Sequence, residues 1–285
     1  MTVDLSPGPH RLSTLEFTSD LGFAARQRLG LLDLAETVRL WRLCWTLAWL
    51  DIRLRYRGSM LGPFWLTLST AVMAGSMGFV YATLFNMNLR EYLPFLTLSL
   101  VLWGYLGALV SEGCTAFTSA EGMIRSVRMP FSAYAARIVL RNLLVLAHNL
   151  VVIVAVYALL AVWPGAKVVL VLPGLVLWLV DSLAVCLLFG ALCARFRDIP
   201  PIVGSIMQMA FFISGVIWKP SQLGGQEWIL AFDPFFTLLE VVRAPLLGEL
   251  PGTAVWASAL GCSAALCGVS WLLFTRVRGR IAFWV

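Results

Sequence analysis

Charged residues are scarce in this chain: they make up 13% of its 285 residues. An average soluble domain has about 25% charged residues, which cover its surface. Because hydrophobic residues make up 60% of the chain, most of its surface must face something other than water. This balance argues against a water-soluble domain and makes lipid the expected solvent.

Motifs for catalysis are also missing. The chain lacks the P-loop pattern GxxxxGK[ST], and neither of its two lysines, Lys167 and Lys219, follows that glycine spacing. ATP hydrolysis by this chain is therefore not expected. Two histidines, His10 and His148, are too few for a histidine-based metal site. No HExxH, GxSxG or paired carboxylates indicate an enzyme, although a membrane-embedded glycosyl- or acyltransferase stays open as an alternative, because such enzymes can have weak signatures.

Cysteines form no CxxC pair, which argues against disulfides and metal binding. All but one lie in apolar runs, and that one is on an amphipathic segment. We interpret all six as small apolar fillers: Cys44, Cys114, Cys186, Cys193, Cys262 and Cys267.

Long runs with little or no charge are abundant. A helix crosses the hydrocarbon core of a membrane in about 20 residues, and lipid cannot satisfy loose backbone amides. The sequence therefore predicts an all-α integral membrane protein in which residues 58–285 form six transmembrane helices. The predicted spans are 58–89, 92–120, 142–166 (with a start near Phe131), 168–194, 199–218 and 250–275.

The positive charges predict the orientation. With a cytoplasmic N-terminus, the cytoplasmic segments hold 17 of the 21 lysines and arginines, and the other side holds Arg90, Lys167, Lys219 and Arg243. This bias places both termini in the cytoplasm and explains the basic balance without nucleic acid. Residues 1–30, the predicted N-terminal cytoplasmic segment, lack an apolar core typical of signal peptides. The first span is then expected to act as its own insertion signal.

Two hydrophobic segments do not fit a span. In VRLWRLCWTLAWLDIRLRYR, residues 38–57, arginines share one helical face and tryptophans a neighbouring one. This pattern predicts an amphipathic interface helix over residues 31–57, the alternative being a soluble helix against another domain. Residues 227–250, EWILAFDPFFTLLEVVRAPLLGEL, contain five charged residues, among them Asp233, Glu240 and Arg243, and two prolines. They predict short or re-entrant helices on the external side, over about residues 219–249.

Three motifs carry a family resemblance. DIRLRYRGSMLGPFW (51–65), RFRDIPPIV (195–203) and FDPFFTLLEVVRAPLLG (232–248) resemble segments of type-2 ATP-binding-cassette (ABC) exporter permeases. The closest group is the polysaccharide exporters, which move O-antigen, capsule or teichoic acid chains. The resemblance spans roughly residues 33–280, with Asp233 where the family commonly has asparagine.

The resemblance implies a bacterial inner-membrane homodimer bound to two copies of a separate ATPase, which holds ATP and magnesium. Residues 119–130 would then be a coupling helix that docks on the ATPase, the alternative being a plain positively charged loop. Its apolar residues would supply contact area and its charged residues ion pairs. The expected docking residues are Glu121, Met123, Ile124, Arg125, Val127, Arg128 and Met129.

The expected substrate is a lipid-linked polysaccharide, with another amphiphile, such as a lipid or a drug, as the alternative. We predict a cytoplasmic entrance where basic residues meet the phosphate of the lipid carrier, at Arg53, Arg55, Tyr56 and Arg57. Aromatic rings can stack on sugars, and those predicted to line a tunnel are Phe64, Trp65, Phe79, Tyr81, Trp103, Tyr105, Trp178 and Trp218. The alternative for these rings is interfacial belts and packing. Two acids within spans, Glu112 and Asp181, should face protein or water rather than lipid.

Overall fold

The computed structural model describes residues 22–58, 60, 62 and 64–285. Within these residues every regular element is a helix, as predicted. Five helical stretches are long and apolar enough to cross a membrane, so the chain is a multi-pass membrane protein. They are built on α3 (Phe64–Leu84), α4 (Leu89–Cys114), α6 (Phe131–Leu160), α7 (Val171–Arg195, preceded by η2, Gly165–Leu170) and α10 (Thr253–Val277).

The fifth predicted span differs from a full-length helix. α8 covers only Ile199–Ile213, 15 residues, or about 22 Å of a hydrocarbon core that is about 30 Å thick. The helix stops because Gly215 adopts a positive φ of 60°, a conformation that glycine accepts at little cost. The chain continues to Trp218 without regular helix.

The predicted interface helix is two helices. α1 (Phe23–Arg39) begins earlier than expected, and the backbone of Leu40 (ψ 16°) separates it from α2 (Trp41–Arg55). Gly30 permits a close approach of α1 to α10, because an added Cβ would lie 2.7 Å from Cγ2 of Thr275. The tryptophans of α2 stay exposed, as the amphipathic pattern predicts. Residues 1–21 of the predicted N-terminal segment lie outside the described residues.

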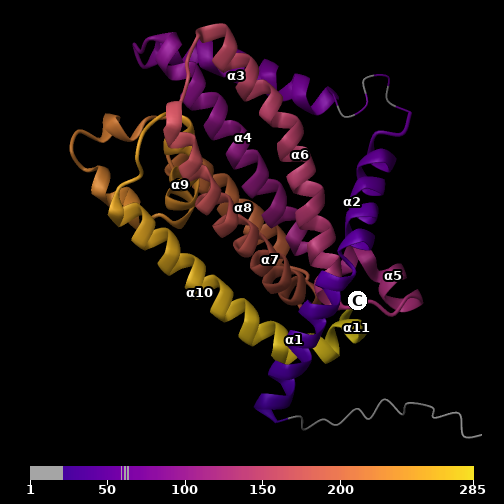
Figure 1. Cartoon of the computed structure of the whole chain (residues 1–285). Coiled ribbons are helices and arrows are strands. Elements are labelled where there is room, and N and C mark those ends of the chain that lie inside the picture. The colour runs from indigo at the N-terminus through magenta and orange to yellow at the C-terminus, as the bar shows by residue number, and fades with distance from the viewer. Residues whose placement is uncertain (1–21, 59, 61, 63) are drawn as a thin grey trace, which may run out of the picture.

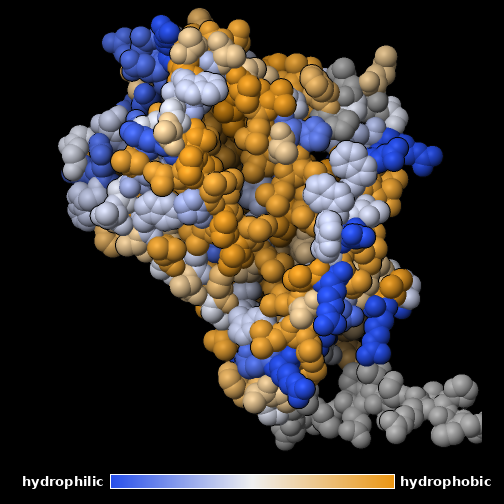
Figure 2. All heavy atoms as spheres, viewed as in Figure 1, coloured by the Kyte–Doolittle hydropathy of each residue, from blue (hydrophilic) through white to orange (hydrophobic). Residues whose placement is uncertain are grey.

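The bundle has two distinct ends (Figure 1). At one end lie α1, the short α5 (Glu121–Ser126) with η1 (Thr118–Ala120) before it, and α11 (Ile281–Trp284), which follows η5 (Arg278–Arg280). At the other end lie η3 (Pro220–Leu223), η4 (Glu227–Phe232) and α9 (Pro234–Leu246). Between the ends, the face in Figure 2 is mostly hydrophobic, and hydrophilic residues gather towards its margins.

Helix α4 is the most enclosed of the five long helices and α3 the least. Leu96, Leu98 and Leu102 of α4 are almost completely buried. Gly78 of α3 packs against α4, since an added Cβ would meet Leu93 at 2.5 Å. The core of this chain is therefore centred on α4, while much of α3 is exposed.

Candidate functional site

The segment predicted to dock on an ATPase projects between α4 and α6. Its helix, α5, ends at Ser126, and Val127 to Pro130 continue without regular helix. The helix is therefore shorter than the predicted 119–130, and Arg128 lies after its end. Arg125 is tied internally: its guanidinium contacts Glu121 at 2.7 Å and donates to the carbonyl of Val285 at 2.9 Å. Arg128 is exposed, and no bond from it to a described residue is found.

The apolar residues of this segment divide into two sets. Met123, Ile124 and Met129 are half-buried and pack against the core of this chain. Val127 is 49% exposed and stands beside Arg128. The outward surface of the segment is thus made mainly by Glu121, Arg125, Val127 and Arg128.

An ionic network ties α2 to the long helices at the same end of the bundle. Asp51 of α2 pairs with two arginines of α6. Arg137 donates to it through Nε at 2.7 Å and through a terminal nitrogen, and Arg141 donates to it at 3.1 Å. Arg141 also pairs with Glu112 of α4 at 2.7 Å. Glu112 accepts a further bond from Arg55 of α2 at 2.9 Å.

The network has a surplus of positive charge, since three arginines share two carboxylates. Nε of Arg141 is buried without a hydrogen-bond partner among the described residues. Arg137 also places a terminal nitrogen 4.0 Å from Sδ of Met123 in the docking segment. These contacts link α2, α4, α6 and α5 mechanically.

Sequence reasoning identified only part of this network. Glu112 was expected in the middle of a span, but it lies in the last turn of α4, which ends at Cys114. Its partners there are arginines from the interface region. The missed residues had a signal: Arg137 and Arg141 are four apart on one helical face, and Asp51 is the one acid in residues 38–57.

The four predicted entrance residues are not equivalent. Arg55 is engaged with Glu112, and this hydrogen bond raises its pKa above the usual range. Arg53 and Arg57 are exposed, and neither guanidinium group has a bonded partner among the described residues. Tyr56 is half-buried at the end of α2. Gly58 and Gly62 have positive φ angles of 85° and 54°, consistent with the predicted change of direction, whereas Pro63 lies outside the described residues.

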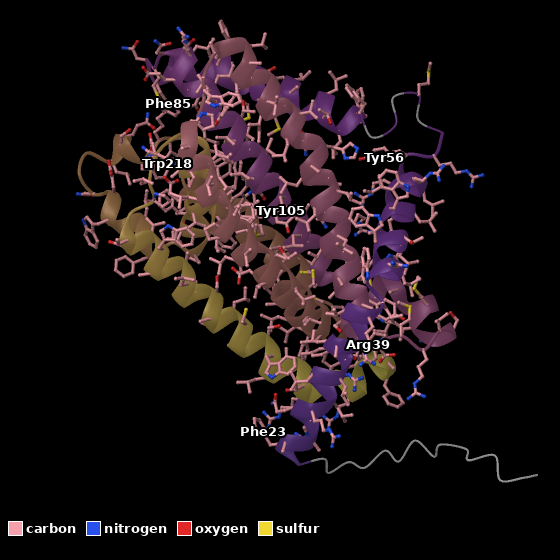
Figure 3. All side chains as sticks on the ribbon, in the orientation of Figure 1. Phe23, Arg39, Tyr56, Phe85, Tyr105 and Trp218 are labelled. Atoms are coloured by element: carbon pink, nitrogen blue, oxygen red, sulfur yellow. The ribbon has the colours of Figure 1, made fainter. Side chains whose placement is uncertain are left out.

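The eight aromatic residues of the predicted tunnel do not form a common lining within one chain. Three are buried: the rings of Tyr105 and Trp178 stack at 5.3 Å, and Trp103 packs against Phe211 and Phe235. Figure 3 places Tyr105 inside the bundle. On α3, by contrast, three rings are exposed and one is half-buried: Phe64, Trp65, Phe79 and Tyr81.

Trp218, the last of these aromatics, lies near Phe85 at the end of the bundle opposite Phe23 (Figure 3). It is half-buried, and its indole donates to the carbonyl of Phe212 at 2.9 Å. This bond closes the turn that ends α8. No ring contact joins Trp218 to the stacked pair of Tyr105 and Trp178 among the described residues.

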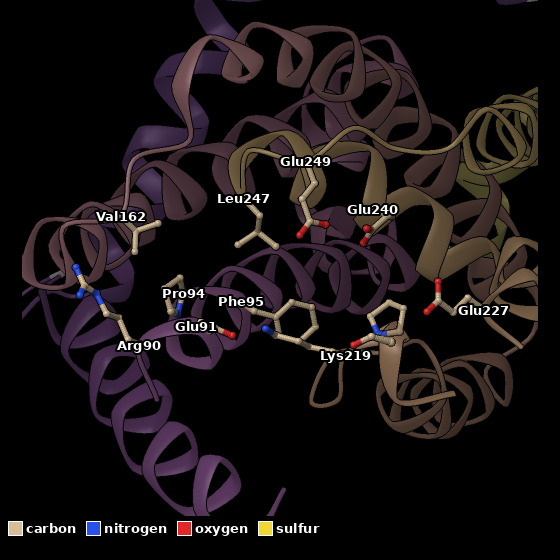
Figure 4. A pocket seen from close by; sticks show the side chains of 12 residues that line it. Arg90, Glu91, Pro94, Phe95, Val162, Lys219, Glu227, Glu240, Leu247 and Glu249 are labelled. Atoms are coloured by element: carbon tan, nitrogen blue, oxygen red, sulfur yellow. The ribbon is translucent and has the colours of Figure 1, made fainter. Parts of the chain in front are cut away.

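A polar cavity of about 700 Å³ opens at this same end (Figure 4). Carboxylates of Glu240 and Glu249 lie on one side of it, with Glu91, Lys219 and the ring of Phe95 opposite, while Arg90 points away. Glu240 is held by the fully buried Arg243, through bonds of 2.6 and 2.9 Å. The cavity thus offers carboxylates, an ammonium and an aromatic surface together.

Arg243 was not singled out as a site residue, yet it organises this end of the bundle. Its guanidinium stacks over Phe95 at 4.5 Å and donates to Ser99 Oγ at 2.8 Å and to the carbonyl of Gly215 at 2.7 Å. These contacts and the pairing with Glu240 offset the free-energy cost of burying the charge completely. The charged position in an apolar segment was visible in the sequence, but its partners were not.

Asp181, the second predicted acid, lies in the middle of α7 and is 5% exposed. It accepts hydrogen bonds from Ser263 Oγ at 2.6 Å and Cys267 Sγ at 3.9 Å, both on α10. No group of acids, histidines and cysteines in the described part of the chain could hold a metal ion.

Comparison with known proteins places these features in a family. Residues 42–247 match the ABC-2 type transporter family. The chain is 25% identical over 201 residues to the O-antigen export system permease protein RfbA of Myxococcus xanthus, covering 68% of this chain and 76% of the relative. It is 20% identical over 191 residues to the protein of that name from Klebsiella pneumoniae, covering 66% of this chain and 74% of the relative.

Proposed function

The chain belongs to the ABC-2 type transporter family, and from this membership we propose that it is the permease of an exporter that moves a lipid-linked polysaccharide across the bacterial cytoplasmic membrane. The observation that carries the proposal is the match over residues 42–247, together with relatives named as O-antigen export permeases. Energy comes from a separate ATPase subunit, which holds ATP and magnesium. The chain itself carries no catalytic role.

The docking segment supports the ATPase partner. Val127 and Arg128 form an exposed apolar and basic pair at the end of the bundle that bears α1 and α11. Such a pair suits a groove with an acidic rim, because charge complementarity speeds association and fixes register. We infer a homodimer of this chain with two ATPase copies, in which the second copy covers the exposed face of α3.

The chain crosses the membrane six times if α8 and the non-helical residues 214–218 together form one crossing. The backbone groups freed after α8 are satisfied by side chains: Gly215 accepts from Arg243 at 2.7 Å and Ile217 accepts from the hydroxyl of Tyr92 at 2.5 Å. Irregular backbone at membrane depth is tolerated where protein surrounds it. Both termini and α5 are then cytoplasmic, and η3 to α9 are external.

Cysteine labelling tests this topology. In a chain without native cysteines, Ser126→Cys should react with an impermeant thiol reagent only after the cells are opened, and Gln222→Cys should react in intact cells. Labelling of Ser126→Cys from outside contradicts the orientation. If neither cysteine reacts in opened cells, both positions are buried, and the same labelling is carried out with Arg128→Cys and Gln226→Cys.

The cavity of Figure 4 supports passage of a glycan at the external end. Carboxylates accept hydrogen bonds from sugar hydroxyls, an ammonium donates to their oxygens, and an aromatic ring can cover an apolar face of the sugar. In the proposed exporter, Glu240, Glu249 and Lys219 contact the polysaccharide as it emerges.

Reconstitution tests the function itself. Permease and ATPase are co-purified and placed in liposomes, and ATP hydrolysis is measured with a lipid-linked polysaccharide, with the same polysaccharide lacking lipid, and with a phospholipid. Stimulation and transport specific to the lipid-linked form support the proposal. Equal responses to the phospholipid favour the alternative substrate, another amphiphile.

A further inference from the structure

A second, apolar cavity of about 310 Å³ lies within the membrane-spanning bundle, bounded by α4, α7, α8, α9 and α10. Its walls are mostly large apolar side chains, including Leu109, Met207, Phe235 and Leu266. Its size is at the lower end of ligand pockets, which span about 300–1,000 Å³. Ile206 and Cys262 line its open side and are themselves exposed or half-exposed, so the cavity is reached from between α8 and α10.

One acid stands in this apolar wall. Asp181 lines the cavity at mid-span, and the described residues give it only neutral hydrogen-bond donors, the Ser263 hydroxyl and the distant Cys267 thiol. Glu112, the other acid of the spans, has two arginines. A charge at membrane depth is costly unless it is paired. Asp181 therefore has no cationic partner among the described residues, and the cavity is the open space beside it.

We propose that this cavity binds a monocationic amphiphile, whose ammonium group contacts Asp181 and whose apolar body fills the walls between α8 and α10. The charge of Asp181 selects the sign of the ligand, because an anion would be repelled and a neutral molecule would form at most a hydrogen bond, without the attraction of opposite charges. The apolar walls select a hydrophobic body. The site is separate from the polar external cavity and does not depend on glycan export.

The ligand enters from the membrane. Ile206 of α8 is 46% exposed, and Cys262 and Leu266 of α10, both half-exposed, also line the cavity. A hydrophobic amine concentrates in the bilayer and reaches the opening without crossing water. A bound ligand would cover Cys262, which gives the site a chemical reporter.

The test uses the full-length purified chain with Cys262 as its one reactive cysteine, obtained by changing Cys44, Cys114, Cys186 and Cys193 to Ala and Cys267 to Ser. The rate of Cys262 alkylation by N-ethylmaleimide is measured with 4-phenylbutylamine and with its neutral analogue 4-phenylbutan-1-ol. The amine should give half-protection at a concentration at least about tenfold lower than the alcohol does. Asp181→Asn should bring this ratio to about one.

A matched control excludes simple partitioning into detergent. Val269 lies on α10 and is 56% exposed but does not line the cavity. In a variant with Val269→Cys and Cys262→Ser, neither compound should protect the new cysteine. Equal protection of Cys262 by amine and alcohol overturns the proposal, as does an amine preference that survives Asp181→Asn. Asp181→Asn counts as folded only if 4-phenylbutan-1-ol still protects Cys262 at the concentration that protects the parent, so misfolding is distinguished from loss of the charge.

Discussion

The carboxylate of Asp33 in α1 caps the start of α6 by accepting a hydrogen bond of 2.9 Å from the backbone amide of Ser132. It also accepts from the amide of Phe131 at 3.1 Å and from Nε of Arg278 at 2.6 Å. The acid is 1% exposed. One buried side chain thus joins α1, the first turn of α6 and the segment after α10, directly behind the docking segment.

Loss of Asp33 should destabilise the permease. Asp33→Ala removes a helix cap and leaves Arg278 without its partner, which together should lower the free energy of unfolding by about 2–4 kcal/mol. Asp33→Asn should cost less, because the amide oxygen still accepts from the backbone. Thermal unfolding of the purified chain measures both. Glu36→Ala, at an exposed position of α1, is the control and should change little; an equal loss there contradicts the capping role.

The pairing of Asp51 with Arg137 should be strongly cooperative. A double-mutant cycle with Asp51→Ala and Arg137→Ala should give a coupling free energy of about 1–3 kcal/mol, because both side chains are mostly buried. The comparison cycle uses Glu121 and Arg125, an exposed pair four residues apart, which should give at most about 0.5 kcal/mol. Equal coupling in the two cycles would show that the network adds nothing beyond a surface ion pair.

The long helices could be predicted from the sequence because apolar runs of about 20 residues are local signals. The order of elements and both non-spanning segments follow from such signals. The length of α8 does not, since residues 199–218 are uncharged throughout. The chain leaves the helix where Arg243 and Tyr92 donate hydrogen bonds to its freed carbonyls. Tertiary partners thus decided what the local pattern left open.

The candidate site was less predictable for the same reason. Asp33 and Phe131 are 98 positions apart, and Asp51 and Arg137 are 86 apart, so no window of sequence contains both partners. Residue type suggested that the arginines near α2 bind phosphate. It could not distinguish Arg55, which is engaged by Glu112, from Arg53 and Arg57.

In the docking segment, Arg128 should matter more to ATPase binding than Arg125. Arg125 is already paired with Glu121 and Val285, whereas Arg128 is exposed beside Val127. Arg128→Glu should weaken the association of the proposed ATPase at least about tenfold, and Arg125→Glu should have the smaller effect. Binding of the purified subunits measures this. Arg90→Glu, at the other end of the bundle, is the control. If Arg125→Glu weakens ATPase binding more than Arg128→Glu does, the ATPase contacts α5 itself rather than the residues after it.

At the proposed entrance, Arg53 and Arg57 should affect the response to substrate, while Arg55 should affect the fold. Arg53 and Arg57 have guanidinium groups available for a lipid-linked phosphate, whose oxygens suit arginine's planar donors. Changing either to Gln should raise the concentration of lipid-linked polysaccharide that half-stimulates ATP hydrolysis by about tenfold and leave basal hydrolysis unchanged. Arg55→Gln should instead lower the unfolding temperature, because Glu112 loses one of its two arginines. If Arg53→Gln and Arg57→Gln both respond to substrate like the parent, these arginines only anchor α2 to anionic lipid. A loss of stimulation in Arg55→Gln alone would move the entrance to the α2–α4 junction.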